Sequence, residues 1–100
     1  MNQTILQGFH WYTEGNGVFY KHMKEISDQL QELGITTVWF PPAYKAAGGD
    51  NSVGYDPYDL FDLGEFDQKG TIATKYGTKD EYVDACKTLQ SKGVSVMVDV

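Results

Sequence analysis

The pattern of apolar and polar positions predicts two strands, in which successive side chains point to opposite faces. From Ile5 to Tyr12 the alternation places Gln7 and Trp11 on the same face, with Trp11 nearer the carboxyl end. From Val94 to Val100 every second residue is valine, and the opposite face ends in Asp99. One strand therefore carries an apolar face and a face that ends in a carboxylate.

A third stretch, Ile35–Phe40, is apolar almost throughout and rich in β-branched and aromatic side chains. Such a run is typical of a strand that is buried on both faces of a sheet. Pro41-Pro42 ends it, because proline cannot donate to a strand ladder. The sequence thus predicts a second strand, fully buried, in the middle of the chain.

Two amphipathic helices are predicted between these strands. In the first, from about Val18 to Leu33, apolar residues recur at helical spacing, and Gly34 is placed to end the helix. The second begins at Thr78, because Thr78 and Glu81 have the spacing of a capping box. Its end is marked by Gly93. The residues expected on its inner face are Tyr82, Cys86 and Leu89.

A weak internal repeat supports this division. Leu30–Ile35 and Leu89–Val94 share Leu, Gln and Gly at the same offsets, and each marks a helix that runs into a strand. The order strand, helix, strand, helix, strand predicts an α/β fold with a parallel sheet and right-handed connections. That sheet is either open or part of a closed (β/α)8 barrel, and three strands cannot close a barrel.

The segment from Ala43 to about Gly77 is long for a connection in a compact domain, and connections of that length are more often functional than incidental. It follows the second strand, so Tyr55 and Tyr58 are expected at the same sheet edge as Asp99. Tyrosine rings can lie against the apolar face of a sugar, and a carboxylate can bind its hydroxyls. The alternatives are ordinary loop packing for the rings and a buried structural role for Asp99.

Four acidic residues recur every third position in this segment, which raises the question of a calcium site. They are Asp56, Asp59, Asp62 and Glu65. Their spacing does not match an EF-hand loop, so we favour a solvated or self-capping loop over a metal site. Trp11 is read first as a core residue, with ligand contact as the alternative.

Composition narrows the class of partner. With 14 acidic and 8 basic residues the net charge is -6, which disfavours nucleic acid but is compatible with a neutral ligand. Neither a membrane-spanning run nor a signal peptide is predicted, and the single Cys86 agrees with a reducing compartment. We therefore expect a cytoplasmic location and no contact with a membrane.

Taken in order, several segments closely resemble the α-amylase family of glycoside hydrolases, in particular its bacterial liquefying-type members. The resemblance covers essentially all 100 residues, so it is more specific than any one motif. The segments that carry it are Gln7–Tyr12, Gly34–Lys45, Val53–Phe66, Lys69–Thr71 and Thr74–Thr78.

The family's fold is a (β/α)8 barrel, of which residues 1–100 resemble the first three strands and two helices. The resemblance implies that residues 43–77 contribute to the substrate cleft and that Tyr55 stacks on the sugar at the cleavage subsite. Asp99 matches the aspartate that opens the family's Asp-Val-Val-x-Asn-His segment. With Gln7 and Trp11, these are the expected substrate-binding residues.

The resemblance also implies what the chain would lack. The family's nucleophile, acid/base and third carboxylate belong to segments after later strands, and its calcium ligands would follow Val100. We therefore expect a fragment of an enzyme that cleaves internal α-1,4 links of starch, glycogen or maltooligosaccharides with retention, inactive alone, with calcium bound only by the parent enzyme.

Two alternatives remain open at this point. The chain could be a non-catalytic α/β module that binds saccharide or assembles with a partner. Its parent could also be a transglycosylase or an α-1,6-acting relative, because loops set specificity. In isolation the chain is expected to aggregate or oligomerise, since an incomplete barrel exposes strand edges and an apolar sheet face.

Overall fold

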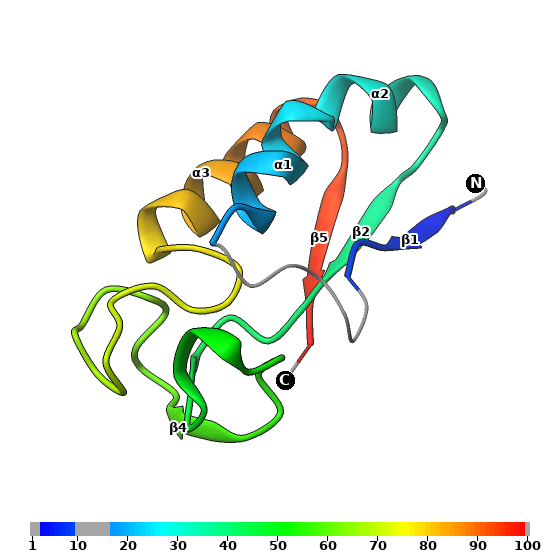
Figure 1. Cartoon of the computed structure of the whole chain (residues 1–100). Helices are drawn as coiled ribbons and strands as arrows, with labels where there is room; N and C mark the ends of the chain where they lie inside the picture. Colours follow the sequence, from blue (N-terminus) through cyan, green and yellow to red (C-terminus); the bar gives the residue numbers. More distant parts are fainter. Residues whose placement is uncertain (1–2, 10–16, 100) are drawn as a thin grey trace.

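Three short parallel strands form a sheet at the centre of the fold. The computed structural model describes residues 3–9 and 17–99. The strand order is β1-β2-β5, and the register pairs Leu6 with Val38 and Val38 with Val96. The predicted parallel sheet is therefore confirmed (Figure 1). The strands are β1 (Ile5–Gln7), β2 (Thr37–Phe40) and β5 (Ser95–Val98).

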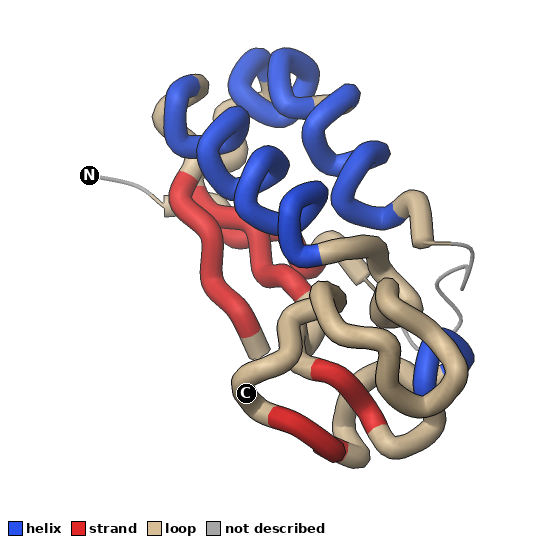
Figure 2. The backbone as a smooth tube through the Cα atoms, turned by 90° about the vertical axis from the view of Figure 1, so that its left-hand side faces the viewer, coloured by secondary structure: helices blue, strands red, loops and turns tan. Residues whose placement is uncertain are grey.

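The three α-helices lie in one layer over one face of this sheet, as Figure 2 shows. They are α1 (Phe19–Glu25) and α2 (Ser27–Glu32), which precede β2, and α3 (Lys79–Ser91), which precedes β5. Two successive right-handed connections that step in the same direction across a sheet place their helices on the same face. Sequential strand order with one helical layer is the arrangement found in a (β/α)8 barrel.

The prediction of one continuous helix from Val18 to Leu33 is wrong, because the helix breaks at Ile26. Ile26 has φ -93° and ψ 6°, outside the helical region, and it separates α1 from α2. Helix propensity does not explain the break, because Ile26 and Ser27 are no weaker helix formers than Asp28, which lies inside α2. Ser27 is buried at the break. The two short helices still occupy the place of one crossover.

Both crossovers end in the same glycine motif. The amide of Gly34 donates to Gln31 O and that of Ile35 to Leu30 O, at 3.1 and 3.0 Å. At the end of α3 the amides of Gly93 and Val94 make the matching bonds to Gln90 O and Leu89 O. Gly34 and Gly93 have φ values of 80° and 77°, which glycine adopts without strain. The internal repeat is therefore a repeated helix stop.

The start of α3 is also as predicted. Thr78 accepts a hydrogen bond from the Glu81 amide at 3.3 Å, and the Glu81 carboxylate accepts one from the Thr78 amide at 2.9 Å. Ala85 and Leu89 are buried on the inner face of α3, while Tyr82 and Cys86 pack beside them half-buried. The capping box thus sets where α3 begins.

The prediction that the second strand is buried on both faces is wrong for the described residues. Val38 and Phe40 are fully buried beneath the helices, whereas Thr37 and Trp39 on the opposite face are half-buried. On that same face Ile5 and Met97 are 53% and 46% exposed. The described helices cover one face only, so burial alternates along the strand.

The first and third strands are shorter than predicted. β1 ends at Gln7, and Phe9 turns into the core, where its ring meets Trp39 edge-on at 6.1 Å. The rest of the predicted first strand includes Trp11, which lies outside the described residues. β5 keeps the predicted alternation, with Val96 and Val98 packed against the core.

An aromatic cluster joins the helices, the sheet and the long segment. Phe19 of α1 contacts Phe40 and Tyr76 with ring centroids 5.5 and 5.4 Å apart, both edge-on. The ring centroids of Tyr20 and Phe40 lie 5.9 Å apart in the same cluster. Since Tyr76 belongs to the segment after β2, this cluster ties that segment to the core.

The segment 43–77 contains three short elements of regular structure among its turns, and it gathers at the carboxyl ends of the strands (Figure 1). Two short antiparallel strands pair within it, and two isolated bridges follow. Its elements are β3 (Lys45–Ala46), the 3-10 helix η1 (Gly49–Asn51) and β4 (Pro57–Asp59). Among the described residues, no helix has the length and apolar character needed to cross a bilayer.

Candidate functional site

Tyr55 and Asp99 meet at the carboxyl edge of the sheet. The Tyr55 hydroxyl donates to Asp99 Oδ2 at 2.5 Å, across 44 positions of sequence. Asp99 directly follows β5, and its amide donates to Phe40 O at 3.0 Å, which extends the ladder to this position. The long segment and the third strand thus converge as the sequence predicts.

The environment keeps the Tyr55 hydroxyl protonated. Loss of hydration, and then the hydrogen bond to the Asp99 carboxylate, raise the pKa of Tyr55 to about 12. The side chain is nevertheless 49% exposed. Tyr55 therefore presents an accessible ring whose outer end is fixed by a carboxylate, a geometry suited to stacking against the apolar face of a sugar.

The other predicted site residues are placed differently. Gln7 ends β1 on the open face of the sheet, and its carboxamide donates to Phe9 O at 2.9 Å. Tyr58 lies on β4 with the Lys69 ammonium 4.3 Å from its ring centroid, a cation–π contact. Trp11 lies outside the described residues, so its predicted role stays a prediction. Tyr55 and Asp99 are the predicted residues that the structure brings together.

The backbone next to Tyr55 is held from both sides. Tyr76 Oη donates to Val53 O at 2.8 Å, two residues before Tyr55. On the other side, Asp56 O accepts from the Ala47 amide at 2.7 Å. The Asp56 carboxylate also accepts from the Gly48 amide at 2.9 Å and from the Ser52 hydroxyl. Tyr55 thus lies between two restrained residues.

A buried ion pair lies inside the same segment. Lys45 Nζ is 3.4 Å from Asp62 Oδ2, and neither side chain is exposed. The ammonium also donates to three backbone carbonyls, those of Phe66, Thr71 and Ile72, at 2.9, 2.7 and 2.8 Å. One side chain therefore holds β3 against two later turns of the segment.

The Asp62 carboxylate is equally well supplied with partners. Burial by itself raises its pKa, but hydrogen bonds from the amides of Glu65 and Gly64 and from the Gln68 side chain outweigh that effect. The resulting pKa of Asp62 is about 2. Asp62 is therefore ionised at neutral pH and complements the Lys45 ammonium.

Three of the acidic residues that recur every third position, Asp56, Asp59 and Asp62, accept hydrogen bonds from backbone amides of their own segment. Asp59 accepts from the Phe61 amide and from the Gln68 carboxamide, both at 3.0 Å. Glu65 pairs with Lys79 at 3.2 Å. Within residues 3–9 and 17–99, no group of three or more His, Cys, Asp or Glu side chains is arranged to hold a metal ion.

Sequence reasoning missed Lys45 and Tyr76. Lys45 follows an apolar and proline-rich stretch, where a lone lysine gives no sign of being fully buried. Tyr76 lies in a stretch of polar residues, yet its ring is 1% exposed. Both side chains donate to backbone carbonyls. Every residue has such a carbonyl, so the identity of the acceptor residues cannot reveal these bonds.

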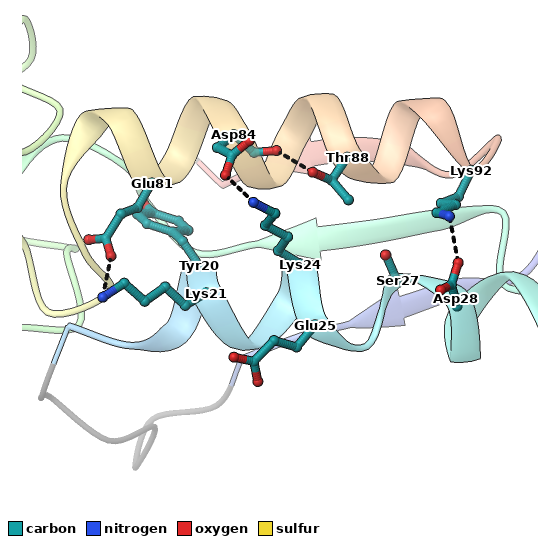
Figure 3. A pocket seen from close by; sticks show the side chains of 10 residues that line it. All are labelled: Tyr20, Lys21, Lys24, Glu25, Ser27, Asp28, Glu81, Asp84, Thr88 and Lys92. Atoms are coloured by element: carbon teal, nitrogen blue, oxygen red, sulfur yellow. Dashed lines mark hydrogen bonds and ion pairs between the residues drawn. The ribbon is translucent and has the colours of Figure 1, made fainter.

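A separate groove of about 530 Å³ runs between the helices (Figure 3). Its charged side chains form three ion pairs across it: Lys21–Glu81 at 3.1 Å, Lys24–Asp84 at 2.6 Å and Lys92–Asp28 at 2.6 Å. These pairs join α3 to α1 and α2. The groove's lysines are thus engaged in holding the helical layer together.

The order of the strands and the position of the site together define a class of protein. Sequential parallel βα units with a site at the carboxyl ends of the strands characterise the (β/α)8 barrel enzymes. The family model "Alpha amylase, catalytic domain" matches residues 14–100. The chain belongs to the α-amylase family of glycoside hydrolases.

Individual relatives agree with this family. The chain is 52% identical to the cytoplasmic alpha-amylase of Escherichia coli, over 99% of this chain and 20% of that protein. It is 50% identical to an alpha-amylase of Bacillus licheniformis, over 100% of this chain and 19% of that protein. A solved alternansucrase in complex with isomaltononaose matches with a TM-score of 0.80 and 25% identity, over 97% of this chain and 9% of that one. The chain thus spans about a fifth of the length of these amylases.

Proposed function

We propose that this chain is the first part of the catalytic barrel of an α-amylase that hydrolyses internal α-1,4 links of starch, glycogen or maltooligosaccharides with retention. The bond from Tyr55 to Asp99 at the carboxyl edge of the sheet carries this proposal. It brings a ring platform and a hydroxyl-binding carboxylate together where barrel enzymes bind their substrates. The identities to two amylases support the same reading.

The role proposed for these residues is to bind the glucan, not to break its bonds. A retaining glycosidase needs two carboxyl groups about 5–5.5 Å apart on either side of the scissile link. The carboxylates of Asp56, Asp59 and Asp62 are occupied by hydrogen bonds within their own segment. We therefore assign Tyr55 and Asp99, with Gln7 and Trp11, to substrate binding, and leave the chemistry to other parts of the enzyme.

The proposal also covers the cellular location of the enzyme and its binding of calcium. We place the enzyme in the cytoplasm, supported by the identity to the cytoplasmic relative from Escherichia coli. Calcium, which the resemblance implies for the whole enzyme, would be held by ligands outside the described residues.

A graft provides the test. We define the grafted amylase as the Escherichia coli cytoplasmic alpha-amylase whose matching stretch is replaced by these 100 residues. Unmodified, it is expected to hydrolyse a blocked maltoheptaoside, and Tyr55→Ala is expected to lower kcat/KM about tenfold, because the sugar loses its ring platform. A folded graft without hydrolysis would overturn the proposal.

The native protein supplies a second measurement. Its intact mass, taken alongside hydrolysis of the same substrate, distinguishes the amylase from the non-catalytic module. A mass several times that of 100 residues, with activity, supports the amylase. A mass matching these residues, with saccharide binding and no hydrolysis, supports the module instead.

A further inference from the structure

We propose that Tyr76 and Asp56 are positioning residues for Tyr55, holding the backbone on either side of it so that its ring faces the glucan. This inference rests on the function proposed above, since it concerns how the ring platform is kept in place. It adds two residues that touch neither sugar nor scissile bond. Their effect on catalysis would pass entirely through Tyr55.

The hydrogen bond of Tyr76 connects the site to the hydrophobic core. The Tyr76 ring is 1% exposed and packs edge-on against Phe19 at 5.4 Å. Its amide donates to Thr74 Oγ1 at 3.2 Å, and its carbonyl accepts from the Tyr20 amide at 3.1 Å. A ring fixed at so many points gives Val53 O a fixed donor.

The Tyr76 hydroxyl is a dependable donor at any working pH. Burial, and then the nearby Tyr55 phenol, raise the pKa of Tyr76 well above its ordinary value. The hydroxyl therefore stays protonated, and its proton is directed to the carbonyl two residues before Tyr55.

Asp56 secures the chain on the other side of Tyr55. Its carboxylate accepts from the Gly48 amide and the Ser52 hydroxyl, and its carbonyl accepts from the Ala47 amide. These bonds fix the residue after Tyr55 to the turn that follows β3. This turn belongs to the same long segment, so Asp56 restrains Tyr55 through contacts within the segment. Tyr76, by contrast, connects the segment to the hydrophobic core.

These restraints matter because Tyr55 itself is only lightly held. Its ring is about half exposed, and its hydroxyl bond to Asp99 fixes one end of it. Small displacements of positioning groups reduce catalysis strongly, of the order of a hundredfold for about 1 Å. Removing the restraint from Tyr76 or from Asp56 alone is expected to lower kcat/KM by less than this, because the other restraint and the bond to Asp99 remain.

The test is a mutant cycle in the grafted amylase. Tyr76→Phe removes one hydroxyl and keeps the packed ring, and we expect kcat/KM for blocked maltoheptaoside to fall about fivefold. In the Tyr55→Ala background the same change is expected to have no further effect, because the platform to be positioned is gone. Equal losses in both backgrounds, or none in either, would overturn the proposal.

Tyr82→Phe is the matched control. Tyr82 belongs to the same aromatic cluster, 5.2 Å from Tyr20, and it lies on α3 rather than beside residues 53–56. Removing its hydroxyl is expected to leave kcat/KM unchanged. A loss equal to that of Tyr76→Phe would mean that any core hydroxyl matters, which would also overturn the positioning role.

Asp56 gives a second, independent route should Tyr76→Phe fail to fold. Asp56→Ala is expected to lower kcat/KM several-fold when Tyr55 is present and not when it is alanine. Asp56→Asn keeps one acceptor oxygen and is expected to recover part of the loss. Failure of the unmodified graft would count against the proposed function, whereas an active graft without these couplings would count against the positioning roles alone.

Discussion

The ammonium of Lys45 lies 3.4 Å from the carboxylate of Asp62, and both side chains are fully buried in a segment that contains little regular structure. Burying two charges costs free energy, which their attraction offsets only when further hydrogen bonds satisfy both groups. Here three carbonyls complete the shell of Lys45, and amides complete that of Asp62. The pair therefore joins β3 to the later turns of the segment.

Lys45→Met should therefore destabilise the grafted amylase strongly. It leaves the Asp62 carboxylate buried without its cation, and uncompensated buried charges cost about 3–5 kcal/mol. The measurement is the fall in unfolding temperature by calorimetry. Lys79→Met is the control, because its partner Glu65 is partly exposed and such surface pairs contribute about 0–1 kcal/mol. Equal effects of the two changes would show that burial of the pair is unimportant.

The pair also predicts how stability depends on pH. The pKa of Asp62 is lowered from 3.8 to about 2 in the folded chain, so its contribution is fully present above pH 4. It is lost as the pH falls towards 2, and it amounts to roughly 2 kcal/mol. Urea unfolding of the unmodified graft and of Asp62→Asn should differ most at neutral pH and converge near pH 2. A difference that persists unchanged at pH 2 would contradict the assignment.

The hydrogen bond between Tyr55 and Asp99 predicts a change in the pKa of Tyr55 when Asp99 is replaced. The pKa of Tyr55 is about 12, raised first by lost hydration and then by Asp99. Asp99→Asn removes the second cause, so the Tyr55 midpoint should fall towards 10, as read from the ring carbon shift by NMR in selectively labelled grafted amylase. Because the folded pKa is the higher one, the bond is fully present below pH 10 and is lost as the pH rises through 12. An unmoved midpoint would show that the carboxylate does not act on the phenol.

The isolated 100 residues are predicted to self-associate and to be inactive. Ile5 and Met97 are half exposed on the sheet face that the described helices do not cover, and β1 and β5 are edge strands. Light scattering after gel filtration should report oligomers or aggregates, and blocked maltoheptaoside should remain intact. The double change Ile5→Lys and Met97→Lys should reduce association. A sharp cooperative melt from a monomer of the unmodified chain would contradict this prediction.

The elements with local causes can be predicted from the amino-acid sequence. The capping box of Thr78, the helix stops at Gly34 and Gly93, and the alternation in β5 depend on neighbours within a few positions. The parallel sheet follows from their order. The resemblance to α-amylases also lies in the sequence, and it points to Tyr55 and Asp99 before any geometry is known.

Contacts between distant residues follow from tertiary folding, which local sequence patterns do not describe. It broke the first helix at Ile26, left one face of β2 half-buried, buried Lys45 and Asp62 together, and set the Tyr76 hydroxyl on Val53 O. Local pattern cannot show which charge loses its water or which carbonyl gains a donor. Those outcomes depend on chain segments that meet only after folding, and they fix where Tyr55 and Asp99 stand.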